Sequence, residues 1–171
     1  MDALLVDHCH LERKAATSAL NLMKYPELAG RTRELNAIAQ EELGHFNLLL
    51  DLLENRCVAF GQSHASPFIC LLMRNIRKGR SEQVIDHLLA ASLIEGRSCE
   101  KFQILAKALL ASEPEIAQLY ADLGESEGNH YADFWLMACE IDNTEAHERL
   151  DVFLDLDAEM IQQLHGLPLL H

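Results

Sequence analysis

The feature that most constrains the fold of this sequence is an apolar row, interrupted in its middle by a glutamate, that recurs in four long segments. In residues 31–55 the row steps by three or four residues, the spacing at which side chains share one face of an α-helix. Glu42 and His45 interrupt it. Residues 113–141 show the same pattern, interrupted by Glu127 and His130. We therefore expect two helices that each turn a glutamate and a histidine towards the protein core.

Two further segments carry a single glutamate in the corresponding place. In residues 82–110, apolar residues recur at seven-residue steps on both sides of Glu95, and in residues 2–25 they do so around Glu12. The chain has only 8 glycines and 4 prolines, and Val, Thr and Tyr, which strands favour, are few. The expected fold class is therefore all-α, with these four helices forming a bundle.

A short extra helix and a C-terminal helix complete the expected fold, in a single domain over residues 1–171. The expected helix boundaries are about 2–25, 31–55, 67–79, 82–110, 113–141 and 145–165. The signals for these ends are proline and polar capping residues: Pro26, Ser66 with Pro67, Ser81, the run Ser112-Glu-Pro-Glu115, Asn143 or Thr144, and Gly166 with Pro168.

The chain repeats a pattern of one helix with a glutamate followed by one helix with E-x-x-H. An E-x-x-H pair alone means little in a chain with 17 glutamates and 9 histidines. Four buried carboxylates, however, cost several kcal/mol each unless they are paired, and no Lys or Arg occupies these rows. We therefore expect them to bind two metal ions, as in ferritin-like four-helix bundles. The expected ligands are Glu12, Glu42, His45, Glu95, Glu127 and His130.

Carboxylate-rich sites with one imidazole per ion favour Fe(II) or Mn(II) over Zn or Cu. Small residues are expected to line the site and leave room for an apolar group: Ala15, Ala16, Ala19, Ala91, Ser92 and Ser98. Near the ligands, we expect His8 to be partly buried or to hydrogen-bond a ligand, and Tyr120 to pack in the core or to hydrogen-bond near the site. Glu41 and Glu100 are expected to face solvent or to hydrogen-bond a ligand. From the residues alone, di-iron O₂ chemistry and iron oxidation both remain open.

The formal net charge of −13 disfavours a polyanionic partner in general, but the charge is unevenly spread. Residues 1–86 hold ten Lys and Arg against eleven Asp and Glu, whereas residues 87–171 hold four against sixteen. A basic run in the nearly neutral half permits local contact with an anion. The sequence shows no apolar run long enough to span a membrane and no signal peptide. The five cysteines are interpreted as small buried residues in a reducing cytoplasm.

Four stretches of the sequence resemble one known family. They are LLVDHCHLERKAATSAL (4–20), AQEELGHFNLLLDLL (39–53), LIEGRSCEKF (93–102) and ESEGNHYADF (125–134), and together they are similar to the MiaE tRNA hydroxylases. The resemblance implies an O₂-dependent di-iron monooxygenase that hydroxylates the isopentenyl group of 2-methylthio-isopentenyl-adenosine in tRNA, with the six residues above as iron ligands.

The resemblance also implies two iron ions as cofactor, O₂ as co-substrate, tRNA as partner and a separate reductase as electron donor. We expect a cytoplasmic monomer or small oligomer. The alternatives are another di-iron oxidase of a small apolar substrate, or a ferritin-like iron-binding or storage protein without catalysis. The basic run is the predicted tRNA contact, comprising Arg74, Arg77, Lys78 and Arg80; the alternative set is Arg13, Lys14, Arg31 and Arg33.

Overall fold

Helices account for nearly all of the residues that the computed structural model describes, 1–62 and 66–163, and no strand occurs among them. The all-α prediction is confirmed. In chain order the elements are α1 (Asp2–Leu22), the 3₁₀ helix η1 (Pro26–Arg31), α2 (Thr32–Asn55), α3 (Pro67–Arg74), α4 (Arg80–Leu109), α5 (Pro114–Ile141) and α6 (Asn143–Gln163).

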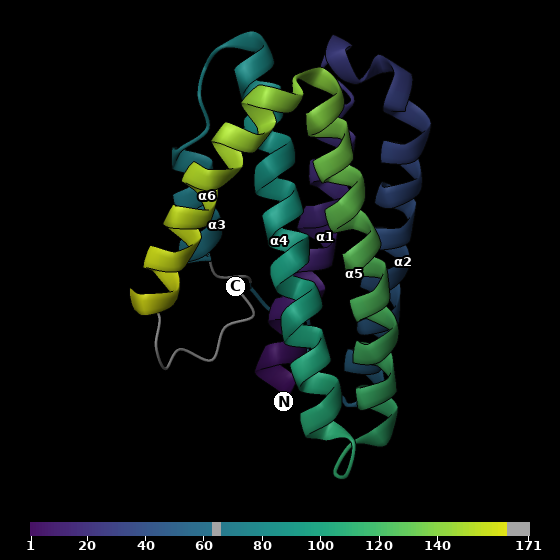
Figure 1. Ribbon diagram of the computed structural model, residues 1–171. Helices are drawn as coiled ribbons and strands as arrows, with labels where there is room; N and C mark the ends of the chain where they lie inside the picture. The colour runs from purple at the N-terminus through teal and green to yellow at the C-terminus, as the bar shows by residue number, and fades with distance from the viewer. Residues whose placement is uncertain (63–65, 164–171) are drawn as a thin grey trace.

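The four long helices α1, α2, α4 and α5 lie side by side as a bundle (Figure 1). They form two antiparallel pairs, because α1 packs along α2 and α4 packs along α5. The segment between α2 and α4 contains α3 and returns the chain to the end of the bundle where α2 begins. Both α3 and α6 pack against α4 and against each other, so they cover one side of the bundle.

The core consists of two apolar clusters that lie at different heights along the bundle. One surrounds Leu35, Leu88 and Phe134, and the other surrounds Leu49 and Phe102. In each of the four long helices the predicted glutamate lies between residues of the first cluster and residues of the second. The polar side chains therefore form one layer that is closed on both sides by apolar packing.

Several predicted helix ends are wrong. The first helix ends at Leu22 rather than residue 25, and Pro26 opens η1, which the sequence analysis missed. Tyr25 has an extended backbone, as the residue before a proline prefers. The short helix ends at Arg74 rather than near residue 79, and its predicted N-cap is confirmed, because Ser66 Oγ accepts a hydrogen bond from the Ile69 backbone N–H.

The predicted caps of the last three helices are also wrong. Gly79 precedes α4, so Ser81 lies inside the helix. At α5 the N-cap is Glu113, without a side-chain capping bond; its carboxylate accepts a hydrogen bond from Arg56. Asp142 caps α6 by accepting a hydrogen bond from the Glu145 N–H. The predicted stop signals Gly166 and Pro168 lie outside the described residues.

The cysteine prediction holds only in part. All five cysteines are free, but only Cys9 is buried, and Cys57 is exposed with a φ of 56°. None of the helices in ranges 1–62 and 66–163 combines the length and the apolar character that a membrane span requires.

Candidate metal centre

The polar layer brings all six predicted ligands together in the middle of the bundle. Glu12 comes from α1, Glu42 and His45 from α2, Glu95 from α4, and Glu127 and His130 from α5. Every one of these side chains is buried, and Glu42 is 0% exposed. The helix phase predicted from the apolar rows is therefore confirmed in all four helices.

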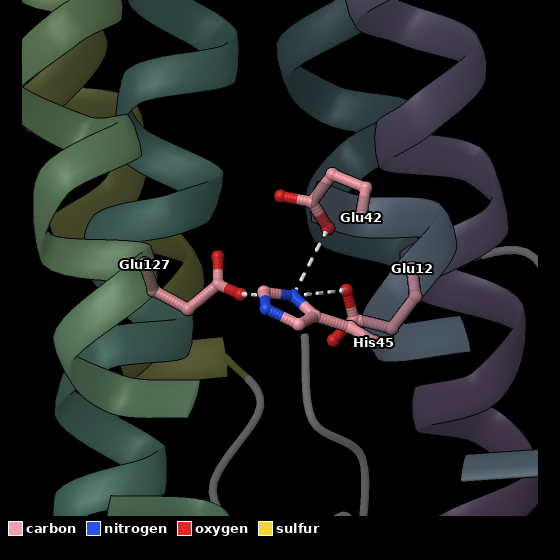
Figure 2. A group of neighbouring side chains, drawn as sticks. All are labelled: Glu12, Glu42, His45 and Glu127. Atoms are coloured by element: carbon pink, nitrogen blue, oxygen red, sulfur yellow. Dashed lines mark ion pairs between the residues drawn. The ribbon is translucent and has the colours of Figure 1, made fainter. Parts of the chain in front are cut away.

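Four of the six side chains form one group, with His45 at its centre and Glu12, Glu42 and Glu127 around it (Figure 2). Its Nδ1 atom is 3.5 Å from Glu12 Oε2, 3.8 Å from Glu42 Oε2 and 3.9 Å from Glu127 Oε1. One ligand atom from each of these four residues lies within 4.8 Å of the others. Side chains from three different helices thus meet at the spacing that a single metal ion can bridge.

The other two residues join the same cluster from the α4–α5 side. His130 Nδ1 is 2.7 Å from Glu42 Oε1, and the carboxyl groups of Glu95 and Glu127 interact directly. Glu42 and Glu127 therefore each contact residues of both helix pairs. Carboxylates in that position are suited to bridging two ions.

The atoms that face the centre of the cluster lack hydrogen-bond partners in the part of the chain that the structure describes. These buried atoms are both carboxylate oxygens of Glu42, Oε1 of Glu127, and Nδ1 of His45 and of His130. An unsatisfied buried polar group costs about 1–3 kcal/mol, and more when it is charged. The atoms left unsatisfied are those that coordinate metals, so the residues present fit a pair of divalent metal ions.

Without metal, the carboxyl groups of the cluster cannot all be ionised. Burial raises the pKa of Glu95 to about 8, and the charge of Glu42 acts in the same direction. Burial also raises the pKa of Glu127 well above its usual range, and the charge of Glu95 adds to this. The pKa of Glu42 is raised by burial as well. The metal-free cluster therefore retains protons at neutral pH.

The histidines of the metal-free cluster hold protons too. Burial alone would lower the pKa of His45, but the nearby carboxylates of Glu12 and Glu42 raise it to about 10. The pKa of His130 rises to about 9, because the adjacent Glu42 carboxylate outweighs burial. Burial raises the pKa of Glu12, yet the charge of His8 and the nearby His45 hold it well below its usual range. Metal binding must displace protons, so metal affinity falls as the pH falls.

Glu41 supports His130 from outside the cluster. One of its carboxylate oxygens accepts a hydrogen bond from Ser126 Oγ at 2.7 Å, and the other lies 3.2 Å from His130 Nε2. The Glu41 carboxylate therefore accepts a hydrogen bond from the Nε2–H group of His130, and His130 Nδ1 is directed at Glu42. Such contacts orient metal-binding histidines. From the sequence, Glu41 and Glu100 were each expected to face solvent or to hydrogen-bond a ligand. Glu41 forms the hydrogen bond, and Glu100 is exposed.

His8 contacts Glu12 in the way that Glu41 contacts His130. It is fully buried rather than partly buried as predicted, and its Nε2 contacts Glu12 Oε1. Its ring lies 4.5 Å from that of Phe102 and 5.4 Å from that of Tyr120, nearly parallel to the latter. Tyr120 thus packs in the core, as expected. The sequence signal for His8 was its place one helical turn before Glu12.

An apolar cavity of about 210 Å³ reaches the cluster from the side of the bundle. At its inner end lie Glu12, Glu95 and Glu127. Its other lining residues are His8, Leu11, Lys14, Ala15, Ser18, Ile69, Met73, Ala91, Ile94, Ser98 and Phe134.

The predicted small lining of the site is correct for Ala15, Ala91 and Ser98. Ser92 instead donates a hydrogen bond to the Tyr131 carbonyl, and neither Ala16 nor Ala19 lines the cavity. Helix α3 also contributes to the wall through Ile69 and Met73, which no pattern in the sequence indicated.

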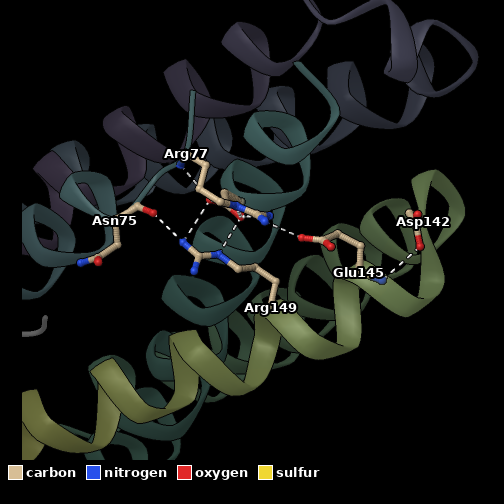
Figure 3. Close-up of polar contacts among 6 residues, drawn as sticks. Asn75, Arg77, Asp142, Glu145 and Arg149 are labelled. Atoms are coloured by element: carbon tan, nitrogen blue, oxygen red, sulfur yellow. Dashed lines mark hydrogen bonds and ion pairs between the residues drawn. The ribbon is translucent and has the colours of Figure 1, made fainter. Parts of the chain in front are cut away.

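None of the four residues of the basic run lines the cavity, and much of the run is engaged within the chain (Figure 3). The Arg77 guanidinium contacts Asp86 at 2.8 Å and Glu145 at 2.5 Å. Asp86 is 0% exposed and also accepts hydrogen bonds from Arg149. Burial raises the pKa of Asp86, but these arginines hold it below its usual range. This network ties α4 to α6.

The other three residues of the run differ from one another. Arg80 pairs with Glu27 at 2.8 Å. Arg74 and Lys78 are exposed and form no ion pair with any described residue. The structure therefore brings the metal ligands together but does not bring this run to the same site.

The fold and the cluster define a ferritin-like helical bundle with a buried carboxylate and histidine cluster that could hold metal. A similar solved structure is Protein 43 with aldehyde deformylating oxygenase activity from Synechococcus, with a TM-score of 0.87 and 32% sequence identity over 99% of this chain and 86% of that chain. The chain belongs to the MiaE family, whose sequence model, described as tRNA-(MS[2]IO[6]A)-hydroxylase (MiaE), matches residues 1–171.

Two curated relatives carry the name tRNA 2-(methylsulfanyl)-N(6)-isopentenyladenosine(37) hydroxylase. The one from Pseudomonas putida is 33% identical over 138 residues, which are 80% of this chain and 66% of the relative. The one from Salmonella typhimurium is 28% identical over 124 residues, which are 72% of this chain and 45% of the relative. The matched region thus spans just under two thirds of the first relative and under half of the second.

Proposed function

We propose that this chain is an O₂-dependent di-iron monooxygenase that hydroxylates the isopentenyl group of 2-methylthio-isopentenyl-adenosine in tRNA, working as one domain over residues 1–171. The observation that carries the proposal is the apolar cavity that ends at three carboxylates of the ligand cluster. Membership of the MiaE family and the names of the two curated relatives support it.

The six clustered residues would hold two iron ions: Glu12, Glu42, His45, Glu95, Glu127 and His130. Iron bound there would supply the activation of O₂. One oxygen atom would enter a C–H bond of the prenyl group as a hydroxyl, and the other would leave as water with two electrons and two protons. We infer that a separate reductase supplies the electrons, since the sequence has no flavin or nicotinamide motif.

The residues around the ligands have three tasks in this reaction. Ala15, Ala91 and Ile94 form apolar walls that admit a prenyl group and exclude water. Glu41 orients the imidazole of His130 through the Nε2 proton. His8 holds the Glu12 carboxylate in its ionised, metal-binding form. Each task preorganises the site before substrate binds.

A cavity-filling substitution tests the proposal. The iron-loaded protein with O₂ and a reductant should add one oxygen to the prenylated nucleoside of tRNA, measured by mass spectrometry of digested tRNA. Ala15→Leu should lower the rate at least tenfold at unchanged iron content, because the larger side chain occupies the prenyl cavity. Ala37→Leu, at an exposed position of α2, is the matched control. A prenylated nucleoside that wild-type protein leaves unmodified contradicts the proposal.

A second candidate function is oxidation of a small apolar substrate. The similar structure from Synechococcus is named for aldehyde deformylating oxygenase activity, and the cavity here is also apolar. Incubating the same iron-loaded protein with aldehydes of different lengths separates the two candidates. Turnover of aldehydes without oxidation of tRNA favours the second. An iron store without catalysis would instead form a large shell, which light scattering detects.

We also infer a cytoplasmic enzyme that is a monomer or a small oligomer. Contact of tRNA with Arg74, Arg77, Lys78 and Arg80 stays a prediction. Within the run, Arg74 and Lys78 are the better candidates, because the charges of Arg77 and Arg80 already face carboxylates of the same chain.

A further inference from the structure

A second groove lies directly beside the prenyl cavity and shares three lining residues with it. Lys14, Ser18 and Met73 line both spaces. The groove has a volume of about 320 Å³ and runs along the last turns of α1 to the first turns of α4. Its remaining lining residues are Arg13, Thr17, Asn21, Leu22, Lys24, Tyr25 and His87. A molecule in the groove is therefore in reach of the cavity mouth.

The charge of this groove is opposite to that of the whole chain. Arg13, Lys14 and Lys24 line it, and no Asp or Glu does, whereas the chain carries a net charge of −13. Arg13 and Lys24 are exposed, and neither forms an ion pair within residues 1–62 and 66–163. Their charges are therefore available to an anionic ligand, in contrast to that of Arg77. A polyanion that approaches this acidic protein therefore meets less repulsion at this groove than the net charge of the chain suggests.

One end of the groove carries an aromatic pair. The rings of Tyr25 and His87 are 6.0 Å apart, and the ammonium group of Lys24 lies 4.9 Å from the Tyr25 ring centre. The Tyr25 hydroxyl is buried without a hydrogen-bond partner among the described residues. Burial and the charge of Lys24 lower the pKa of His87, so its ring is neutral at pH 7. Two half-buried rings beside cations are the elements with which proteins bind single-stranded RNA.

The length of the groove fits a few nucleotides. Its α1 wall extends from Lys14 to Asn21, about 10 Å at 1.5 Å per residue. Nucleotides stacked about 3.4 Å apart along one strand would place about three in that length. A base at the cavity mouth and its neighbours can thus be held at the same time.

We propose that this groove binds the RNA strand next to the target adenosine, with Arg13, Lys14 and Lys24 on its phosphates and the Tyr25–His87 pair against a neighbouring base. The inference rests on the proposed function, because it takes the prenyl cavity as the place of reaction. The target nucleotide is held at the mouth of the cavity, and its prenyl group enters between α1 and α4. The strand therefore follows α1.

Matched charge reversals test the phosphate contacts. The probe is a fluorescent anticodon stem-loop RNA bearing 2-methylthio-isopentenyl-adenosine, titrated with the full, iron-loaded chain and followed by anisotropy at several salt concentrations. Lys24→Glu should weaken binding about tenfold, and the slope of log K against log salt should become shallower by about 0.7. Lys107→Glu makes the same change of charge at an exposed position about 30 Å farther along α4 than His87. It should leave affinity and slope unchanged.

A second pair of variants tests the aromatic contact. Tyr25→Leu removes the ring and should weaken binding at least fivefold, because a stacked base loses its partner. Tyr25→Phe keeps the ring and should bind as wild type does. Melting temperatures and iron content of all variants establish that each is folded and loaded.

The outcomes separate this proposal from the proposed function. If wild-type protein binds the RNA and the Lys24→Glu and Lys107→Glu variants bind it with equal affinity, the groove is not the RNA site. The proposed function is not affected by that result. Equal affinities for Tyr25→Leu and Tyr25→Phe overturn the stacking contact. Wild-type protein that neither binds nor hydroxylates the RNA overturns both the groove and the proposed function.

Discussion

Replacement of Glu95 by glutamine should stabilise the metal-free protein at alkaline pH. In the folded, metal-free chain, burial and the charge of Glu42 raise the pKa of Glu95 from 4.5 to about 8. A carboxyl group with a raised folded-state pKa stabilises the fold fully below its unfolded-state pKa of 4.5. That contribution is lost as the pH rises to about 8, because the unfolded chain releases the proton first.

The size of this effect follows from the two pKa values. Their difference corresponds to about 5 kcal/mol between pH 4 and pH 9. Glu42 and Glu127 share the cluster and also have raised pKa values, so one substitution removes only a part of the penalty. We take about half, and expect metal-free Glu95→Gln to be about 2–3 kcal/mol more stable than wild type at pH 9 and nearly equal to it at pH 5.

The assay is urea unfolding between pH 5 and pH 9, followed by circular dichroism with a chelator present. Glu100→Gln, an exposed position on the same helix, is the control and should follow wild type at every pH. With Fe(II) added under anaerobic conditions the order should reverse, because the variant has lost a ligand and gains less from metal binding. Parallel curves for metal-free wild type and Glu95→Gln from pH 5 to pH 9 would refute the reasoning.

Three further predictions concern the cluster and its surroundings. Wild-type protein should bind two irons per chain and Glu127→Ala fewer, as elemental analysis will measure; full loading of the variant contradicts the ligand assignment. Glu41→Gln should lower iron affinity about 10–100-fold in a chelator competition, because it weakens the bond that orients a ligand imidazole; unchanged affinity contradicts this role. Asp86→Asn should lower the free energy of unfolding by about 3–5 kcal/mol, since it leaves the Arg149 guanidinium without a charged partner and Arg77 with Glu145 alone. Glu145→Gln, which is partly exposed, should cost about 1 kcal/mol or less in the same urea titration.

The helix content and the ligand cluster could be predicted because both depend on local periodicity. An apolar row at a helical spacing fixes which residues face the core, whatever the neighbouring helices are. Glu12 and Glu95 had no E-x-x-H motif to mark them, yet their place in the row put both at the centre of the bundle. The energy of burying four carboxylates then predicted metal binding without knowledge of any distance.

The contacts that the sequence did not reveal join residues far apart in the chain. Glu41 accepts a hydrogen bond from Ser126, which lies 85 residues later in the chain. Helix phase alone could not show whether Glu41 faces solvent or forms a hydrogen bond. The run at residues 74–80 was selected on charge, but charge does not show that Arg77 faces Asp86 and Glu145. Likewise, the capping by Ser112 expected from the run at residues 112–115 is absent, because α5 begins at Pro114 and Glu113 takes the N-cap position.

The division of the bundle into two helix pairs has a consequence for how substrate range can change. Three of the six cluster residues come from α1 and α2, and three from α4 and α5, so the seam between the pairs sets the separation of the two halves of the site. Ala15 on α1 and Ala91 on α4 line the cavity at that same seam. A change of side-chain size there alters the room for substrate without changing any of the six cluster residues. Substrate range can thus evolve through small residues at the seam, separately from the polar cluster.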